Sequence, residues 1–329
     1  MWRGGYAFLV FDFPCDIFAA VLCISIMPKT PIGVSAAKKK DLVIGLVVMS
    51  TSSEYWLGVK AGAEAALERV GGKLIYTGPK TTNDVAEQVA AVENLIIRRV
   101  DGILLTPLDS DALVAPSKQA VRAGIPLVSI DANLNWDGKT SYVGTDNREG
   151  GRIAMELLIK AIGGEGKVVI LNCPAGVPSN DIRGEAAVEV AKKYPKVELL
   201  EIQRGEDQAA AMANMERILN ANPDLKGVFA AFDRAAIGGI QALRNRGLAG
   251  KIKVVAYDAS PEEIDALEKG EIHGLVVQQP YLMGYRGVEY LLAAREGKEV
   301  PKDVFVPITV VTKENMNEVE VQKVLYPAK

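Results

Sequence analysis

The chain has 329 residues, of which 49% are hydrophobic and 24% charged, and its formal net charge is −3. That composition is ordinary for a soluble globular protein, and a single core usually divides at this length, so two lobes are expected. Because a polyanion partner requires clustered Lys and Arg, the balance of charges gives no support to nucleic-acid binding.

The N-terminal segment differs in composition from the rest of the chain. Residues 17–27 form an apolar run with a single Ser, and small residues that suit a cleavage site follow it. Asp12 and Asp16 lie in the longer, largely apolar stretch of residues 6–27 and count against a membrane-spanning helix. We predict a signal peptide over residues 1–36 and export to the periplasm or the cell exterior. The alternative is a misassigned start, with Met27 or another residue as the true first residue.

From residue 41 onward, apolar runs alternate with amphipathic stretches in the rhythm of βαβ units. In the first half, strands are predicted at residues 42–49, 73–76, 102–105 and 125–130, and helices at 55–70, 85–98 and 109–123. In the second half, strands are predicted at residues 140–143, 167–171, 197–202, 227–231, 252–257, 274–277 and 304–311. The helices between them are predicted at residues 147–162, 182–194, 208–221, 235–246, 261–269 and 281–295. The predicted fold class is α/β, with two similar doubly wound lobes that each contain a parallel sheet.

Four polar residues follow apolar runs in this pattern: Asp131, Arg183, Asp258 and Gln278. Ligands of open parallel sheets bind outside the carboxyl ends of the strands, so these side chains could converge on one small polar molecule. Taken singly, each Asp is equally well explained as a helix cap, and Gln278 as a turn residue. Arg183 is predicted to begin a helix, where a cation is unfavourable, and this favours a functional explanation.

An aromatic pair, Tyr55-Trp56, follows the first predicted strand at the start of a helix. Aromatic rings stack on the apolar faces of sugar rings, while carboxylates and Arg bind the hydroxyl edges. We predict that the pair faces the same crevice; the alternative is that both rings simply cap the core.

Motifs for catalysis or metal binding are missing from the sequence. Gly163–Lys167 resembles a phosphate loop, but it precedes a strand and has no Ser or Thr after the Lys, so it is read as a helix-terminating turn. His273 is the only histidine, and Cys173 is the only cysteine after residue 36. Cys173 is expected to pack as a small apolar residue at a strand end. No enzyme activity, metal or cofactor is therefore predicted.

Several short motifs, in their order along the chain, resemble the ribose-binding-protein family of solute-binding proteins, which supply ABC sugar importers. They are Gly45-Leu46-Val47-Val48, Ile103-Leu104-Leu105-Thr106-Pro107, Gly124-Ile125-Pro126 with Asp131, Arg183-Gly184, Asn222-Pro223-Asp224, and Gln278 with Pro280. The resemblance implies a type I periplasmic binding protein fold, with two lobes and a three-stranded hinge. One lobe would span residues 41–145 plus 279–307, and the other 146–278 plus 308–329.

The resemblance also implies a set of ligand-binding positions: Ser53, Tyr55, Trp56, Asp131, Arg183, Asp258 and Gln278. The chain departs from the pattern of ribose binders at Ala132 in place of an Arg, at Phe232 in place of an amide, and at Glu206 in place of an aromatic residue. Asn133, Asn180 or Glu206 would be available to restore contacts. The predicted ligand is a sugar or polyol other than ribose.

The implied partners are this small molecule and the membrane permease of an ABC importer, and the protein is expected to be a monomer that does not bind nucleic acid. Three alternatives use the same fold. The chain could serve a chemoreceptor, or it could bind a nucleoside or another small polar ligand. A LacI-type repressor is disfavoured because the residues before the first strand are apolar rather than basic.

Overall fold

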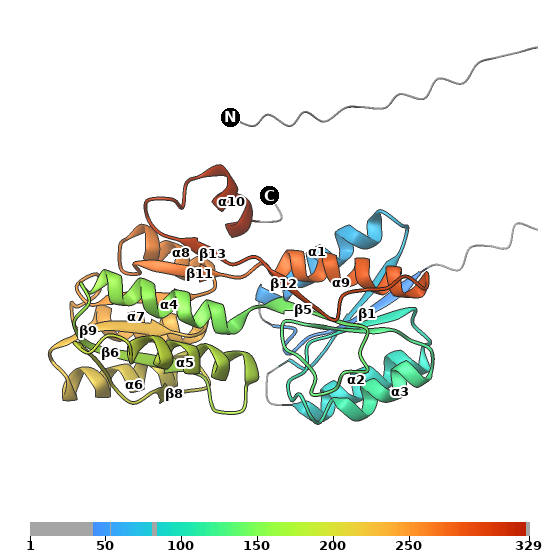
Figure 1. Cartoon of the computed structure of the whole chain (residues 1–329), viewed down its shortest axis with the longest axis horizontal. Coiled ribbons are helices and arrows are strands. Elements are labelled where there is room, and N and C mark those ends of the chain that lie inside the picture. Colours follow the sequence, from blue (N-terminus) through green and yellow to red (C-terminus); the bar gives the residue numbers. More distant parts are fainter. Residues whose placement is uncertain (1–41, 53, 81–83, 327–329) are drawn as a thin grey trace, which may run out of the picture. The chain divides into compact units, whose positions relative to one another are not determined.

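A computed structural model describes residues 42–52, 54–80 and 84–326 (Figure 1). The predicted signal peptide and Ser53 lie outside the described residues. None of the described helices has both the length and the apolar character that crossing a membrane would require.

The first sheet contains six parallel strands in the order β12-β5-β4-β3-β1-β2. Its strands are β1 (Val43–Val47), β2 (Lys73–Thr77), β3 (Gly102–Leu105), β4 (Leu127–Ile130), β5 (Ser141–Thr145) and β12 (Asp303–Val306). Every residue of β3 and β4 is buried, as expected for central strands that are covered on both faces. Helices α1 (Glu54–Glu68) and α9 (Pro280–Arg295) share one buried cluster with the sheet, and α2 (Val85–Ile97) and α3 (Val114–Arg122) share another.

The second sheet has the order β13-β11-β10-β9-β6-β7, with β8 also paired to β6. Its strands are β6 (Gly166–Asn172), β7 (Val197–Leu199), β8 (Gln203–Arg204), β9 (Leu225–Ala230), β10 (Lys253–Tyr257), β11 (Gly274–Val277) and β13 (Thr309–Val311). All pairs are parallel except β11 with β13, which is antiparallel.

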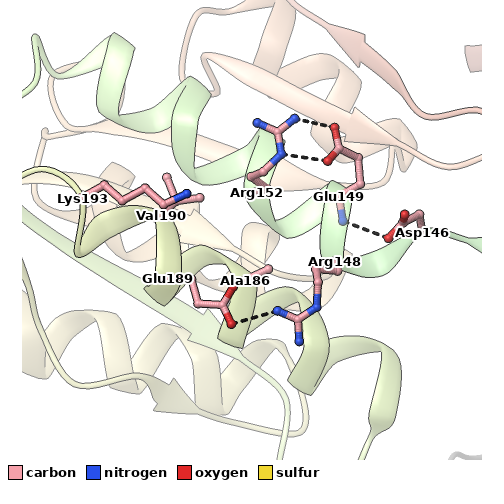
Figure 2. Close-up of a pocket in the computed structure, with 8 residues that line it drawn as sticks. All are labelled: Asp146, Arg148, Glu149, Arg152, Ala186, Glu189, Val190 and Lys193. Atoms are coloured by element: carbon pink, nitrogen blue, oxygen red, sulfur yellow. Dashed lines mark hydrogen bonds and ion pairs between the residues drawn. The ribbon is translucent and has the colours of Figure 1, made fainter.

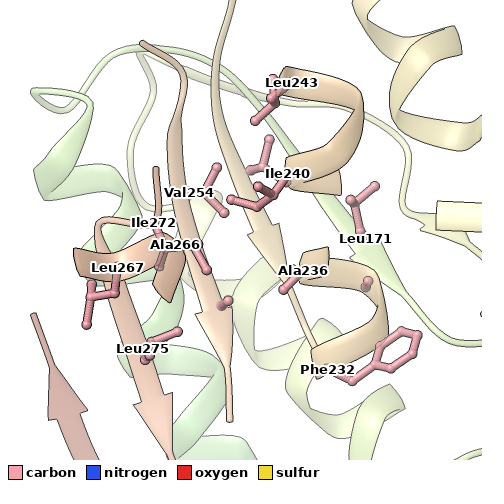
Figure 3. Close-up of a cluster of buried hydrophobic side chains, with 14 of the residues drawn as sticks. Leu171, Phe232, Ala236, Ile240, Leu243, Val254, Ala266, Leu267, Ile272 and Leu275 are labelled. Atoms are coloured by element: carbon pink, nitrogen blue, oxygen red, sulfur yellow. The ribbon is translucent and has the colours of Figure 1, made fainter. Parts of the chain in front are cut away.

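Helices α4 (Asn147–Ala161) and α5 (Pro178–Ala191) pack with the second sheet around one buried cluster. The other buried cluster of this sheet involves α6 (Gln208–Ala221), α7 (Asp233–Asn245), α8 (Pro261–Glu268) and α10 (Val319–Leu325). Figure 3 shows this second cluster, with Leu243, Val254 and Leu275 among its members. The two doubly wound α/β lobes confirm the predicted fold class.

The chain passes between the sheets at three places: from β5 to α4, from β11 to α9 and from β12 to β13. These are the three segments of the hinge. The run predicted as one strand at 304–311 is in fact β12 and β13, which belong to different sheets. Pro307 lies between them, and its missing N–H explains why one ladder does not continue there.

Three other predicted elements differ from the structure. The strand expected at 197–202 ends at Leu199 as β7, and the short strand β8 follows it only at Gln203–Arg204. The helix expected from residue 109 begins only at Val114. The helix expected from residue 182 is α5, which begins at Pro178, so Arg183 lies in its second turn and does not begin it. The sequence argument from an unfavourable helix start was therefore wrong for Arg183. Proline at the first position of a helix was the overlooked signal.

Candidate ligand-binding site

Three of the predicted residues directly follow strands: Asp131 follows β4, Asp258 follows β10 and Gln278 follows β11. Asp131 and Asp258 have φ angles of 63° and 79°, in the left-handed region. This conformation is costly for residues other than Gly, is tolerated best by Asn and Asp, and concentrates at functional sites. The backbone strain at both strand ends is therefore consistent with selection for side-chain placement rather than for stability.

On the side of the first sheet, Asp131 is held by two tyrosines. Tyr55 Oη donates a hydrogen bond to Asp131 Oδ1 at 2.7 Å, and Tyr142 Oη donates to the Asp131 carbonyl at 2.8 Å. Burial raises the pKa of Asp131, while the positive charge of Arg183 and the Tyr55 hydroxyl act in the opposite direction. The carboxylate keeps further lone pairs after these contacts, so it can accept hydrogen bonds from a ligand.

On the side of the second sheet, Arg183 is buried and its partners are all neutral. Nε donates to Asn147 Oδ1 at 2.7 Å and Nη1 donates to the Ala231 carbonyl at 3.0 Å. Its Cζ lies 3.7 Å from the centre of the Tyr257 ring, in cation–π geometry. Gly150 allows this packing, because a Cβ there would lie 1.8 Å from Tyr257 Oη. The guanidinium charge is thus fixed in place without being paired to a carboxylate.

Asp258 and Gln278 form the remaining part of this arrangement. Gln278 Nε2 donates to Asp258 Oδ1 at 2.8 Å. Burial raises the pKa of Asp258 to about 6, although Arg183 and Gln278 lower it. A carboxylate in this condition is costly to keep charged, and hydroxyl donors from a ligand would stabilise it.

A hydrogen bond joins the two sides of this arrangement: Thr145 Oγ1–H, at the end of β5 in the first sheet, donates to Gln278 Oε1, after β11 in the second sheet, at 2.6 Å. The charge of Arg183 influences the pKa values of Asp131 and Asp258, and Asp258 influences that of Tyr55. Asp131, Arg183 and Gln278 are buried, and Tyr55 and Asp258 are partly buried. We call this set the buried cluster: Tyr55, Asp131, Arg183, Asp258 and Gln278. A cluster of one cation, two carboxylates, an amide and a phenol suits a neutral molecule with several hydroxyl groups.

The other predicted residues have different surroundings. Trp56 is 6% exposed and packs in the core under α1 and α9, where it meets Tyr55 edge to face with ring centres 4.8 Å apart. Phe232 precedes α7 and belongs to the hydrophobic core of the second sheet that Figure 3 shows. The side-chain oxygen of Asn133 is buried without a hydrogen-bond partner among the described residues. Glu206 is exposed.

Asn180, which was also considered, is 8% exposed, and its carbonyl accepts a hydrogen bond from Asn172 Nδ2 at 2.9 Å. Sequence reasoning missed three residues that contact members of the cluster: Thr145, which bonds to Gln278, and Asn147 and Tyr257, which contact Arg183. Asn147 follows Asp146, the N-cap of α4, and reads in the sequence as an ordinary helix start. Tyr257 reads as the last residue of a buried strand, so no local signal distinguishes it.

A depression of about 260 Å³ lies elsewhere, between α4 and α5 (Figure 2). Six charged residues line it, and four of them form what we call the α4/α5 charge cluster: Arg148, Glu149, Arg152 and Glu189. Arg148 pairs with Glu189 at 2.9 Å, and these two side chains are 55% and 61% exposed. Because the charges are solvated and neutralise one another, this surface is a poor candidate for holding a small neutral ligand.

The residues set aside by the sequence analysis have structural roles. Gly163 and Gly164 have positive φ angles, and the Gly164 N–H bonds to the Ile159 carbonyl, so this segment terminates α4 as predicted. Cys173 is buried just after β6, as predicted. His273 Nδ1 accepts a hydrogen bond from the Val254 N–H at 3.2 Å. In the part of the chain that the structure describes, no group of His, Cys, Asp and Glu is arranged to hold a metal ion.

Comparisons with known proteins agree with this fold. A family model described as “Periplasmic binding protein domain” matches residues 44–299. The ribose import binding protein of Bacillus subtilis is 28% identical over 279 residues, which cover 84% of this chain and 90% of that protein. An ABC transporter solute-binding protein from Agrobacterium vitis, solved with α-D-tagatopyranose, has a TM-score of 0.83 and 32% identity and covers 87% of this chain and 99% of its own. A second solute-binding protein from Agrobacterium vitis, solved with bound D-fucose, has a TM-score of 0.82 and 34% identity. The match covers 86% of this chain and 100% of that protein.

Proposed function

Because the chain belongs to the periplasmic binding protein domain family, we propose that it captures a sugar or polyol other than ribose and delivers it to an ABC importer. It is a sugar-binding solute-binding protein of an ABC transporter, and it is not an enzyme. The proposed ligand position is the buried cluster, where Gln278, which follows β11 of the second sheet, bonds both to Thr145 at the end of β5 in the first sheet and to Asp258 after β10. This convergence is the observation that carries the proposal.

The chain's differences from ribose binders support a ligand that presents fewer hydroxyl groups to two positions of the site. Ala132 is 2% exposed at a position where the resemblance expects an Arg, and Phe232 is 8% exposed where it expects an amide. A hydrogen bond to a charged group contributes about 1.5–3 kcal/mol, and a hydrogen bond between neutral groups contributes about 1 kcal/mol. The side chains of Ala132 and Phe232 have no polar atoms and can make neither kind of bond with a ligand. An unpaired ligand hydroxyl in a closed site would be penalised, so a sugar that presents an apolar group at these two positions, such as the methyl group of D-fucose, is a better match than ribose.

We propose that binding closes two lobes about the three crossing segments. The lobes would be residues 41–145 plus 279–307 and residues 146–278 plus 308–329, as the resemblance implies. Asp131 and Tyr55 would then belong to one lobe, and Arg183 and Asp258 to the other. A ligand that contacts both groups stabilises the closed form by its difference in affinity for the two states. The closed surface would be recognised by the permease, after export to the periplasm or the cell exterior.

A thermal-shift screen followed by titration calorimetry tests the proposed ligand class. The panel contains D-fucose, D-tagatose, D-ribose, polyols, nucleosides and amino acids. Each is added to the protein without its predicted signal peptide, residues 1–36. A ligand at 100 times its Kd adds about 2.7 kcal/mol to the free energy of unfolding. We expect a sugar or polyol to give the largest shift and D-ribose a smaller one. A shift with a nucleoside or an amino acid and none with carbohydrates would refute the proposal.

A further inference from the structure

Hydrogen bonds connect the buried cluster to the segments that cross between the sheets. Thr145, the last residue of β5, donates its Oγ1 to Gln278 Oε1 at 2.6 Å. Gln278 directly follows β11, so this bond joins the first crossing segment to the second. Thr145 is 1% exposed and Gln278 is 3% exposed. Water therefore cannot easily replace the bond if it is lost.

The Thr145 bond also orients the Gln278 amide. Because Oε1 accepts from Thr145, Nε2 is directed to Asp258, whose Oδ1 accepts from it at 2.8 Å. Thr145 and Asp258 favour the same orientation of the Gln278 amide. The second N–H of Nε2, which has not been used in these bonds, therefore also points in a fixed direction. A side-chain amide that is held in this way loses little entropy when a ligand binds.

Asn147 makes a second connection of the same kind. Its Nδ2 donates to the Thr145 carbonyl at 3.2 Å, and its Oδ1 accepts from Arg183 Nε at 2.7 Å. Asn147 is 7% exposed and Arg183 is 3% exposed. The guanidinium is therefore held by the first crossing segment on one side and by the Tyr257 ring on another.

We propose that Thr145 and Asn147 are positioning residues that hold Gln278 and Arg183 in their ligand-binding orientations. Neither residue contacts the ligand. Through them, affinity for the ligand depends on how the first two crossing segments lie against each other. This inference rests on the proposed function, because it requires that Gln278 and Arg183 contact a sugar.

The test compares Thr145→Val with Ser141→Ala in the full chain. Valine keeps the branched shape of threonine and removes only the hydroxyl. Ser141 lies in the same strand, is fully buried, and donates its Oγ to the Pro301 carbonyl at 2.7 Å, away from the buried cluster. Titrations use D-fucose and D-tagatose. We expect Thr145→Val to raise the Kd about tenfold, Thr145→Ser to restore it, and Ser141→Ala to lower the melting temperature without changing the Kd.

A second variant, Asn147→Ala, addresses the other connection. It leaves the Arg183 Nε–H without its acceptor, so the Kd is expected to rise at least about tenfold. Equal affinities of the wild type and Thr145→Val overturn the inference, and so does an equal loss of affinity in Ser141→Ala.

If neither sugar binds to the wild type, the proposed function fails for these ligands. The positioning roles of Thr145 and Asn147 are then tested in the protein without ligand. The measurement is then the NMR order parameter of the Gln278 side-chain amide. A lower order parameter in Thr145→Val, with no change in Ser141→Ala, supports the inference. An unchanged order parameter in Thr145→Val overturns it.

Discussion

The buried cluster and the α4/α5 charge cluster both combine arginines with carboxylates, but they use the charges differently. Arg148 and Arg152 are exposed and pair directly with Glu189, Glu149 and Glu156. Arg183 is buried and is held by an amide oxygen, a carbonyl and an aromatic ring. A buried cation with neutral partners keeps its charge available for a ligand, whereas a solvated ion pair contributes little to the free energy of unfolding. Five experiments test this contrast.

The largest effect is expected for Arg183→Ala. The substitution removes a buried, positioned cation, and the affinity for the best sugar of the panel should fall by at least about tenfold. Titration calorimetry measures the loss. An unchanged Kd would remove Arg183, and with it the buried cluster, from the proposed ligand site.

The next effect concerns the charge of Asp258, whose pKa is raised to about 6. The folded state binds this proton more tightly than the unfolded state, so the free energy of unfolding falls as the pH rises from about 4 to about 6. Binding should follow the opposite course, because the charged carboxylate accepts the sugar's hydroxyl groups. We expect the Kd to be about tenfold higher at pH 5 than at pH 7.

Asp258→Asn separates these two consequences. Asn tolerates the left-handed backbone at this position, so the substitution removes mainly the charge. The variant should be more stable than the wild type at pH 7, should bind the sugar more weakly, and should lose the pH dependence of the Kd. Thermal melts and titrations at pH 5 and pH 7 measure all three, and a Kd that still varies tenfold would assign the titration to another group.

A smaller effect is expected for Tyr55→Phe, which removes the hydrogen bond to Asp131. The affinity should fall roughly fivefold, corresponding to about 1 kcal/mol for one buried hydrogen bond. Tyr76→Phe is the matched control, because the Tyr76 hydroxyl is buried and has no hydrogen-bond partner among the described residues. If both variants lose affinity equally, the Tyr55–Asp131 bond has no special role in binding.

The smallest effect is expected in the α4/α5 charge cluster. Arg152→Ala removes ion pairs to Glu149 and Glu156 in which every side chain is at least 40% exposed. The free energy of unfolding should change by less than about 0.5 kcal/mol, and the Kd should not change. Denaturant unfolding and the same titrations check this. A loss of sugar affinity here would contradict the contrast between the two clusters.

Much of the fold could be predicted from the sequence because its signals are local. Continuous apolar runs such as β3 and β4 identify central strands, and Gly163-Gly164 identifies the end of α4. The prediction was wrong where tertiary pairing divides a run. Residues 304–311 are apolar throughout except at Pro307 and Thr309, so the local pattern predicts one strand. The pairing of β12 with β5 and of β13 with β11 assigns them to different sheets, on either side of the 307/308 boundary that the family resemblance implies.

For the site, the sequence by itself determined which polar residues follow the strands, as at Asp131, Asp258 and Gln278, because strand ends are visible as the ends of apolar runs. Only the tertiary structure decided what surrounds them. The support of Arg183 by Asn147 and Tyr257, and of Gln278 by Thr145, joins residues 36 to 133 positions apart. Such contacts depend on how the helices and strands pack, and no local pattern of residues encodes them.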